Sequence, residues 1–272
     1  MNNCELLGVY REKRFSPGKV EDDAAILDMT LAALTHQGCR AAGVKPESLR
    51  SLPSRPHWVV TMAQSAEALT LLEEWEKQGT RVINSSAAIR NCYRKPLTRL
   101  LAEAGVKTPQ GRMLRLNGNA APLDLPWAQP LWLKRGDVHA MQEGDVVLIQ
   151  TREDLEPALR HFQRYGIEDA LLQEHIAGEV IKFYGICRRS YFKAFWAVTG
   201  EEATTQVGLL QGLAEEAARA VGIEVYGGDA ALTPEGELFL IDLNDWPSFS
   251  RCCSEAAVNI ASYVMAEMAA RR

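Results

Sequence analysis

Oxygen-bearing side chains gather at the end of one apolar stretch near the C-terminus. Leu238–Ile241 is bulky and apolar, as a buried strand is, but Asp242 and Asn244 follow it directly. Side chains alternate along a strand, so these two point to one face, which Asp229 on the preceding strand can reach across a hairpin. Two carboxylates and an amide oxygen suit Mg²⁺, so the pattern predicts a magnesium site. A polar strand end that runs into a solvated loop is the alternative.

A second candidate site is the basic loop over residues 11–19, which holds four cations in nine residues: Arg11, Lys13, Arg14 and Lys19. It follows an apolar stretch, residues 6–10, that is typical of a first strand. Ligands of open α/β sheets bind at the carboxyl ends of strands, so the loop is placed to hold an anionic small-molecule substrate. A solvated loop explains the same residues.

The elements that must position these residues alternate in type. Strand patterns at 6–10, 39–44, 58–62 and 81–84 enclose helical patterns at 22–37 and 65–79, which predicts a parallel sheet of βαβ units over residues 1–84. Short helices at 87–92 and 97–103 follow. The remaining strands are expected at 110–116, 130–134, 145–150, 169–175, 178–187, 191–198, 225–232 and 237–243. Helices are expected after Thr151, at 209–221 and at 256–270.

Four phrases together resemble the ATP-grasp superfamily. They are AAIRNCYRKPLTRLLAEAGVKTPQ at 87–110, an apolar strand ending in Lys134, DALLQEH at 169–175, and the strand end DLN followed by a Pro-Ser turn. The resemblance implies an α/β chain with the ATP-grasp fold, made of α+β lobes behind an N-terminal parallel-sheet domain. It divides the chain into a substrate-side domain (1–84), a central lobe (85–176) and a C-terminal lobe (177–272).

The resemblance also implies roles for individual residues. Lys95 and Lys134 would contact the phosphates of ATP, and Asp229, Asp242 and Asn244 would hold Mg²⁺ against them. A lysine that ends an apolar strand is not core packing, which agrees with this role. The adenine pocket and the ribose contact would be formed by Gln173, Glu174, His175, Ile176 and Glu179.

Two phrases are similar to the inositol-phosphate kinases of this superfamily: His139 with Met141 after Lys134, and QEHI followed by Lys182. This similarity places His139, Lys182 and Lys193 at the active site, and several cations in one cleft favour a polyanionic acceptor. The preferred interpretation is therefore Mg²⁺-dependent phosphoryl transfer from ATP to a hydroxyl, a kinase reaction. The alternatives are a carboxylate–amine ligase acting through an acyl phosphate, like the D-alanine–D-alanine and glutamate-adding relatives, and a nucleotide-binding regulator without turnover.

Composition excludes other classes. The chain has 272 residues and a net charge of −5, which argues against a nucleic-acid binder with a broad basic surface. No stretch approaches about 18 apolar residues, so no membrane span is expected. The N-terminal sequence lacks the apolar run of a signal peptide, and the six cysteines form no CxxC. We therefore expect a cytoplasmic protein with reduced thiols.

Overall fold

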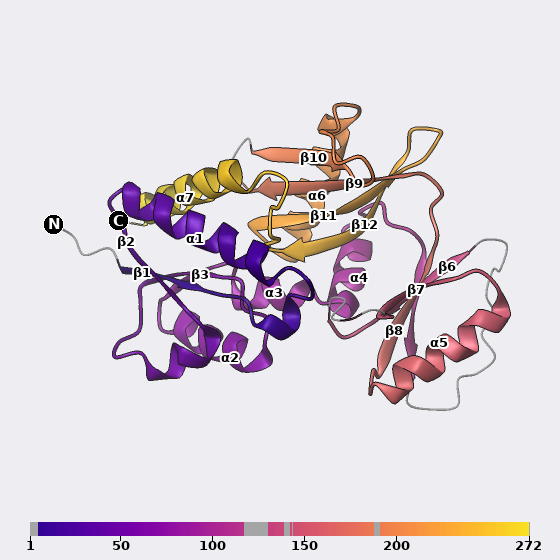
Figure 1. Cartoon of the computed structure of the whole chain (residues 1–272), viewed down its shortest axis with the longest axis horizontal. Helices are drawn as coiled ribbons and strands as arrows, with labels where there is room; N and C mark the ends of the chain where they lie inside the picture. The colour runs from indigo at the N-terminus through magenta and orange to yellow at the C-terminus, as the bar shows by residue number, and fades with distance from the viewer. Residues whose placement is uncertain (1–4, 117–129, 139–141, 143, 188–190, 272) are drawn as a thin grey trace.

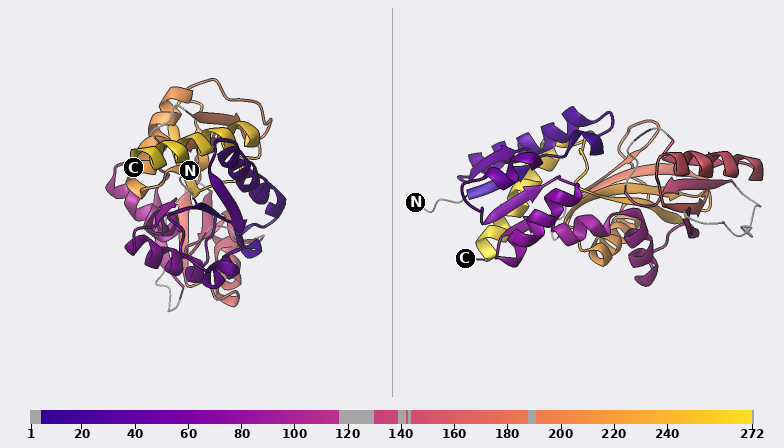
Figure 2. Two further views of the ribbon diagram at one scale, coloured as in Figure 1. Left: turned by 90° about the vertical axis from the view of Figure 1, so that its left-hand side faces the viewer. Right: turned by 90° about the horizontal axis from the view of Figure 1, so that it is seen from below.

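The computed structural model describes residues 5–116, 130–138, 142, 144–187 and 191–271. The predicted site residue His139 lies outside the described residues. Three four-stranded sheets are formed by the described part of the chain. The molecule is elongated, with the N-terminal sheet at one end, a sheet covered by α5 at the other, and the third sheet between them (Figures 1 and 2).

The N-terminal sheet is parallel, as the alternating pattern predicted, with strand order β2-β1-β3-β4. Its elements are β1 (Glu5–Val9), η1 (Lys13–Phe15), α1 (Val20–His36), β2 (Arg40–Val44), η2 (Pro46–Ser51), β3 (Trp58–Thr61), α2 (Ala66–Lys77) and β4 (Arg81–Ile83). Side chains alternate along β1, so Leu6 packs with α1 and Leu7 with α2 on the opposite face. Ser65 caps α2 as predicted, because its Oγ accepts a hydrogen bond from the Ala68 amide at 3.2 Å.

A second, antiparallel sheet has the order β5-β8-β6-β7. It consists of β5 (Gly111–Arg115), β6 (Leu131–Arg135), β7 (Val146–Ile149) and β8 (Asp169–Glu174), with α5 (Arg152–Arg164). Leu131 and Leu133 of β6 pack under α5 with Phe162. Because side chains alternate, Trp132 and Lys134 lie on the opposite face. Lys134 is therefore on the face away from the α5 core, as expected for a lysine that takes no part in core packing.

The third sheet is also antiparallel, with the order β10-β9-β11-β12. It contains β9 (Glu179–Ile186), β10 (Phe192–Trp196), β11 (Val225–Leu232) and β12 (Leu238–Asp245), and it is accompanied by α3 (Ser86–Asn91), α4 (Arg94–Glu103) and α6 (Val207–Val221). Ile181, Phe183 and Leu240 of this sheet share one core with α4 and α6. The opposite face carries the polar residues of the candidate site.

The last helix, α7 (Cys253–Ala270), returns to the N-terminal sheet and lies beside α1 (Figure 1). Its Ile260 and Val264 are fully buried in one core with Leu6 and Ile26. The division of the chain at residues 84 and 176 stays a prediction. Among the described helices, none combines the length and the apolar character needed to cross a bilayer.

Candidate functional site

The three predicted metal ligands share one face of the third sheet. Asp229 on β11 is directly opposite Asp242 on β12, and Asn244 is opposite Gly227 in the next row. The register between the strands shifts beside Asp229, which is a β-bulge. Gly228 permits the close approach of the two strands, because a Cβ atom there would lie 2.2 Å from the carbonyl oxygen of Asp242.

Cations already lie against both carboxylates. Lys182 Nζ donates to Asp229 Oδ1 at 2.7 Å, and Arg94 Nη2 lies 3.7 Å from Asp242 Oδ2. The side chains of Asp229 and Asp242 are 29% and 21% exposed, so their oxygens still reach solvent. No group of three or more His, Cys, Asp or Glu ligands occurs in the described ranges. The predicted set needs only two carboxylates and one amide, and this donor chemistry fits a hard cation such as Mg²⁺.

Two buried cations accompany these carboxylates. Lys134 and Arg94 are each only 4% exposed. Burial lowers the pKa of Lys134 to about 8; Asp242 opposes this shift, Arg94 adds to it, and Asp229 opposes it. The Nε of Arg94 is buried and has no hydrogen-bond partner among the described residues. A buried pair of cations beside two carboxylates suits the binding of a polyanion that carries its own cation.

Arg94 was missed by the sequence reasoning, which chose its neighbour Lys95. The Nζ of Lys95 pairs with Asp169 at 3.0 Å, and its side chain is 55% exposed. Lys95 therefore ties the start of α4 to the second sheet, while Arg94 turns towards Asp242. The available signal was helical spacing: Arg94, Leu97 and Leu101 are the buried residues of α4.

The residues proposed for the adenine pocket follow one another at the end of β8. Gln173 is buried and lies opposite Trp132 on β6, whose indole N–H donates to His175 Nδ1 at 3.0 Å. Glu174 accepts a hydrogen bond from the Gln110 amide at 3.3 Å, and Ile176 is half-buried. Glu179, the ribose candidate, is exposed at the start of β9. Gln173, Glu174 and His175 thus form one continuous edge with Trp132, and Glu179 stands apart from it in the chain.

Arg11 links the basic loop to the end of β12. It lies 3.5 Å from Asp23 and 3.7 Å from Asp245, and it donates to the carbonyl oxygens of Met62, Asp245 and Trp246. Its side chain is 11% exposed. Asp245 in turn accepts from Gln64 Nε2 at 2.8 Å. This network fastens the N-terminal sheet to the strand that carries Asp242 and Asn244.

The other predicted cations are divided among different places. Arg14 pairs with Glu67 at 3.5 Å on the surface. Lys193, on β10, pairs with Glu202 at 2.9 Å and Glu255 at 3.7 Å. These pairings compensate the charges that the sequence counted as facing one cleft.

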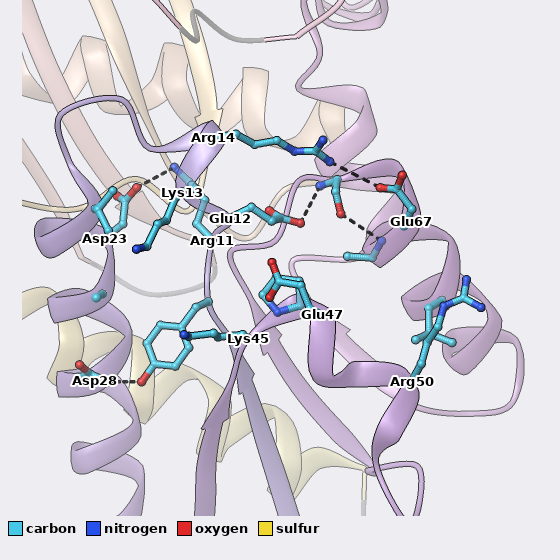
Figure 3. A pocket seen from close by; sticks show the side chains of 17 residues that line it. Arg11, Glu12, Lys13, Arg14, Asp23, Asp28, Lys45, Glu47, Arg50 and Glu67 are labelled. Atoms are coloured by element: carbon cyan, nitrogen blue, oxygen red, sulfur yellow. Dashed lines mark hydrogen bonds and ion pairs between the residues drawn. The ribbon is translucent and has the colours of Figure 1, made fainter.

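Two cavities adjoin this region. The smaller, about 380 Å³, lies against the third sheet, and among its lining residues are Arg11, Lys19, Asp23, Lys182, Asp229 and Asn244. The larger, about 1130 Å³, opens at the carboxyl ends of β1, β2 and β3, where Lys13 and Arg14 line it (Figure 3). Arg11 and Asp23 line both cavities, so this ion pair stands between them.

No protein-family model matches the sequence, and no curated protein matches it either. Solved structures do match over nearly the whole chain. A D-alanine–D-alanine ligase from Bacillus anthracis complexed with ATP gives a TM-score of 0.72 at 10% identity, covering 97% of this chain and 99% of that one. A RimK domain ATP-grasp protein from Sphaerobacter thermophilus gives 0.70 at 20% identity, covering 96% and 99%.

The D-cycloserine synthetase DcsG is similar as well, with a TM-score of 0.68 at 17% identity over 94% of this chain and 99% of that one. At such low sequence identity, these similarities show that the chains share a fold, and they do not identify the substrates of this protein. Together with the three sheets they confirm the fold expected from the sequence: this chain has the ATP-grasp fold.

Proposed function

We propose that this protein is a Mg²⁺- and ATP-dependent ligase that joins a carboxylate to an amine through an acyl phosphate. One observation carries the proposal: the smaller cavity, which Asp229 and Asn244 line, shares the Arg11–Asp23 pair with a second and larger cavity. A kinase needs room for one acceptor besides its nucleotide, whereas a ligase needs room for two substrates. The similar structures named as a D-alanine–D-alanine ligase and a D-cycloserine synthetase agree with this choice.

In this proposal the nucleotide lies between the second and third sheets. The Trp132–His175 edge borders the adenine, and Lys134 and Arg94 face the phosphates. Asp229, Asp242 and Asn244 would hold Mg²⁺, which neutralises charge on the transferred phosphoryl group. The role of the two buried cations is electrostatic: in a site of low polarity they stabilise negative charge more strongly than they would in water.

The chemistry balances as two displacements. A carboxylate oxygen of the first substrate attacks the γ-phosphorus, the bond to the bridging oxygen breaks, and ADP leaves. The amine nitrogen of the second substrate then attacks the acyl carbon, phosphate leaves, and the nitrogen loses a proton. The smaller cavity, beside Lys182 and Asp229, suits the carboxylate, because that group must meet the transferred phosphoryl group.

The kinase interpretation rested on several uncompensated cations around one cleft. Four of the six described cations in that argument have a carboxylate within 3.5 Å: Arg11, Arg14, Lys182 and Lys193. The repulsion that would call for a polyanionic acceptor is therefore offset in part inside the protein. Lys13, which lines the larger cavity, and Lys19, which lines the smaller one, have no such partner in the described ranges and still favour a kinase.

ADP release decides between these functions. The purified chain is incubated with Mg²⁺ and ATP and with mixed carboxylic acids, mixed amines, both mixtures together, or inositol phosphates, and products are identified by mass spectrometry. The ligase releases ADP and phosphate and forms an amide only when acid and amine are both present. An inositol phosphate that gains one phosphate group would overturn the ligase in favour of the kinase.

A further inference from the structure

The larger cavity lies where a parallel sheet offers a ligand site. Tyr10 follows β1, Lys45 follows β2, and Ser65 follows β3 at the start of α2, so the carboxyl ends of three strands meet there. Its volume of about 1130 Å³ is above the range of roughly 300–1,000 Å³ usual for drug-sized ligands. A single amino acid would leave most of this space to water, whereas a short peptide fills it.

The acids that line this cavity are held by the protein itself. Asp23 pairs with Arg11, Glu67 pairs with Arg14, and Asp28 accepts a hydrogen bond from Tyr10. The two oxygens of Glu12 accept from the amides of Gln64 and Ser65 at 3.0 and 3.1 Å. These carboxylates are therefore poorly available to a ligand.

Three of the five cations that line it are available. Among the described residues, Lys13, Lys45 and Arg50 make no side-chain hydrogen bond or ion pair. Glu47 is the lining acid that likewise makes no side-chain hydrogen bond or ion pair within the described part of the chain, and in Figure 3 it is seen between Lys45 and Arg50. Lys13 and Lys45 lie on the side towards α1, and Arg50 lies on the opposite side (Figure 3). The whole lining is neutral, because five carboxylates balance its five cations, but three of the cations and only one of the carboxylates have no partner among the residues that the structure describes. These three cations can therefore pair with carboxylates of a ligand.

The walls between these charges are apolar. Val20 and Ala24 come from α1, Pro46 from η2, and Ala68 and Leu71 from α2. The ring of Tyr10 lies against β2 because residue 43 is glycine, where a Cβ atom would meet the Tyr10 hydroxyl oxygen at 2.7 Å. Apolar walls with convergent charges suit a ligand that has an apolar body and several charged groups.

We propose that the larger cavity binds the amine substrate of the ligation and that this substrate is a short peptide with two carboxylates. The assignment rests on the proposed function. The carboxylates of the peptide pair with Lys13, Lys45 and Arg50, and its amine points to the Arg11–Asp23 pair, beyond which the acyl phosphate forms in the smaller cavity. The free carboxylate of Glu47 disfavours peptides with more than two carboxylates.

Binding tests this assignment without any turnover. A mixture of tripeptides built from Ala, Leu and either Glu or Lys, each with a free or an amidated C-terminus, is equilibrated with the full chain, with and without Mg²⁺ and ADP. Protein-bound peptides are separated by rapid gel filtration and counted by mass spectrometry. Glu-containing peptides with a free C-terminus are expected to be retained at least about tenfold over their amidated forms, since each lost charge contact costs about that factor.

Lys13→Ala/Lys45→Ala should lower that retention by more than about tenfold, with an unchanged Tm. Lys77→Ala is the matched control: it removes an exposed lysine at the far end of α2 that pairs with Glu73 and leaves retention unchanged. Three results would overturn the assignment: the protein retains no peptide, it retains Lys-containing or amidated peptides preferentially, or retention falls equally in the double variant and in Lys77→Ala. Retained peptides are then supplied as amines in the ADP-release assay. Retention without amide formation defeats the ligase function alone, whereas amide formation unaffected by the double variant defeats this assignment alone.

Discussion

The buried ammonium of Lys134 should make nucleotide binding take up protons. With a pKa of about 8, instead of the ordinary 10.5, Lys134 is about half protonated at pH 8 and about one-tenth protonated at pH 9. Phosphate oxygens beside the ammonium favour its charged form and raise the pKa. If the bound value returns to its ordinary range, ADP binding takes up about 0.5 proton at pH 8 and about 0.9 at pH 9.

Titration calorimetry measures this uptake directly. ADP is titrated into the protein in two buffers that differ in ionisation enthalpy, and the slope of the apparent binding enthalpy against that ionisation enthalpy gives the number of protons. ADP does not turn over, and its phosphates are fully ionised at pH 8 and above, so the proton comes to the protein. Affinity should also fall as the pH rises through 8, because a larger fraction of the free protein must first be protonated.

Two variants assign the proton to its residue. In Lys134→Arg the guanidinium stays charged throughout this range, so the uptake should vanish although nucleotide still binds. Lys95→Arg changes the neighbouring exposed lysine and should leave the uptake intact. An uptake that is absent at pH 9 in the unaltered protein, or that persists in Lys134→Arg, would refute the placement of Lys134 against the phosphates.

Three further outcomes follow from the same cluster. Asp242→Asn removes one carboxylate at a partly exposed strand end, so turnover at limiting Mg²⁺ should drop while the Tm hardly changes; normal turnover there would exclude Asp242 as a ligand. In calorimetry, Arg94→Ala should weaken ADP binding about tenfold or more. Lys95→Ala should change ADP binding little, because the exposed pair of Lys95 with Asp169 contributes less than about 1 kcal/mol. If Lys95→Ala weakened ADP binding more than Arg94→Ala did, the phosphate contact would belong to Lys95. The pKa of Lys134 is lower in the folded protein than in the unfolded chain, so between pH 8 and 10.5 the unfolded chain keeps a proton that the folded protein has lost, and stability rises with pH in that window. Across it, the free energy of unfolding in urea should rise by on the order of 3 kcal/mol more for the unaltered protein than for Lys134→Met. A difference between the two that stays constant with pH would contradict the lowered pKa.

The parts of the site that were predictable from the sequence depend on neighbours in the chain. Alternation along β12 places Asp242 and Asn244 on one face, and the tight turn before this strand brings β11 alongside it. Lys134 was recognisable because a charged residue ends an otherwise apolar strand. The β-bulge beside Asp229 was not predictable, because no local signal shows which residue drops out of the ladder.

Arg94 shows how an element boundary can hide a candidate site residue. The sequence analysis began its second helix at residue 97 and placed Lys95 between the two helices, where the ATP-grasp resemblance implies a Lys or Arg that contacts the phosphates. In the structure α4 begins at Arg94, and burial repeats at 94, 97 and 101 along one helix face. The ends of a helix are hard to predict from sequence, because capping and tertiary contacts both decide them. An error of three residues in the predicted start of α4 was enough to favour exposed Lys95 over buried Arg94.

The partners of the other cations come from distant parts of the chain, so no count along the sequence could supply them. Lys182 meets Asp229 through strand pairing, and Arg11 meets Asp245 only because β12 ends beside the N-terminal sheet. Each ion pair removes one reason for a polyanionic acceptor, while the same pairing leaves Lys13, Lys45 and Arg50 free around the larger cavity. Three cations without a partner among the described residues therefore line the larger cavity, while Lys134, Arg94 and Lys19 remain for the nucleotide and the smaller cavity. Under the proposed function, this division would direct the carboxylates of the amine substrate to the larger cavity and leave the smaller cavity to the substrate that accepts the phosphoryl group.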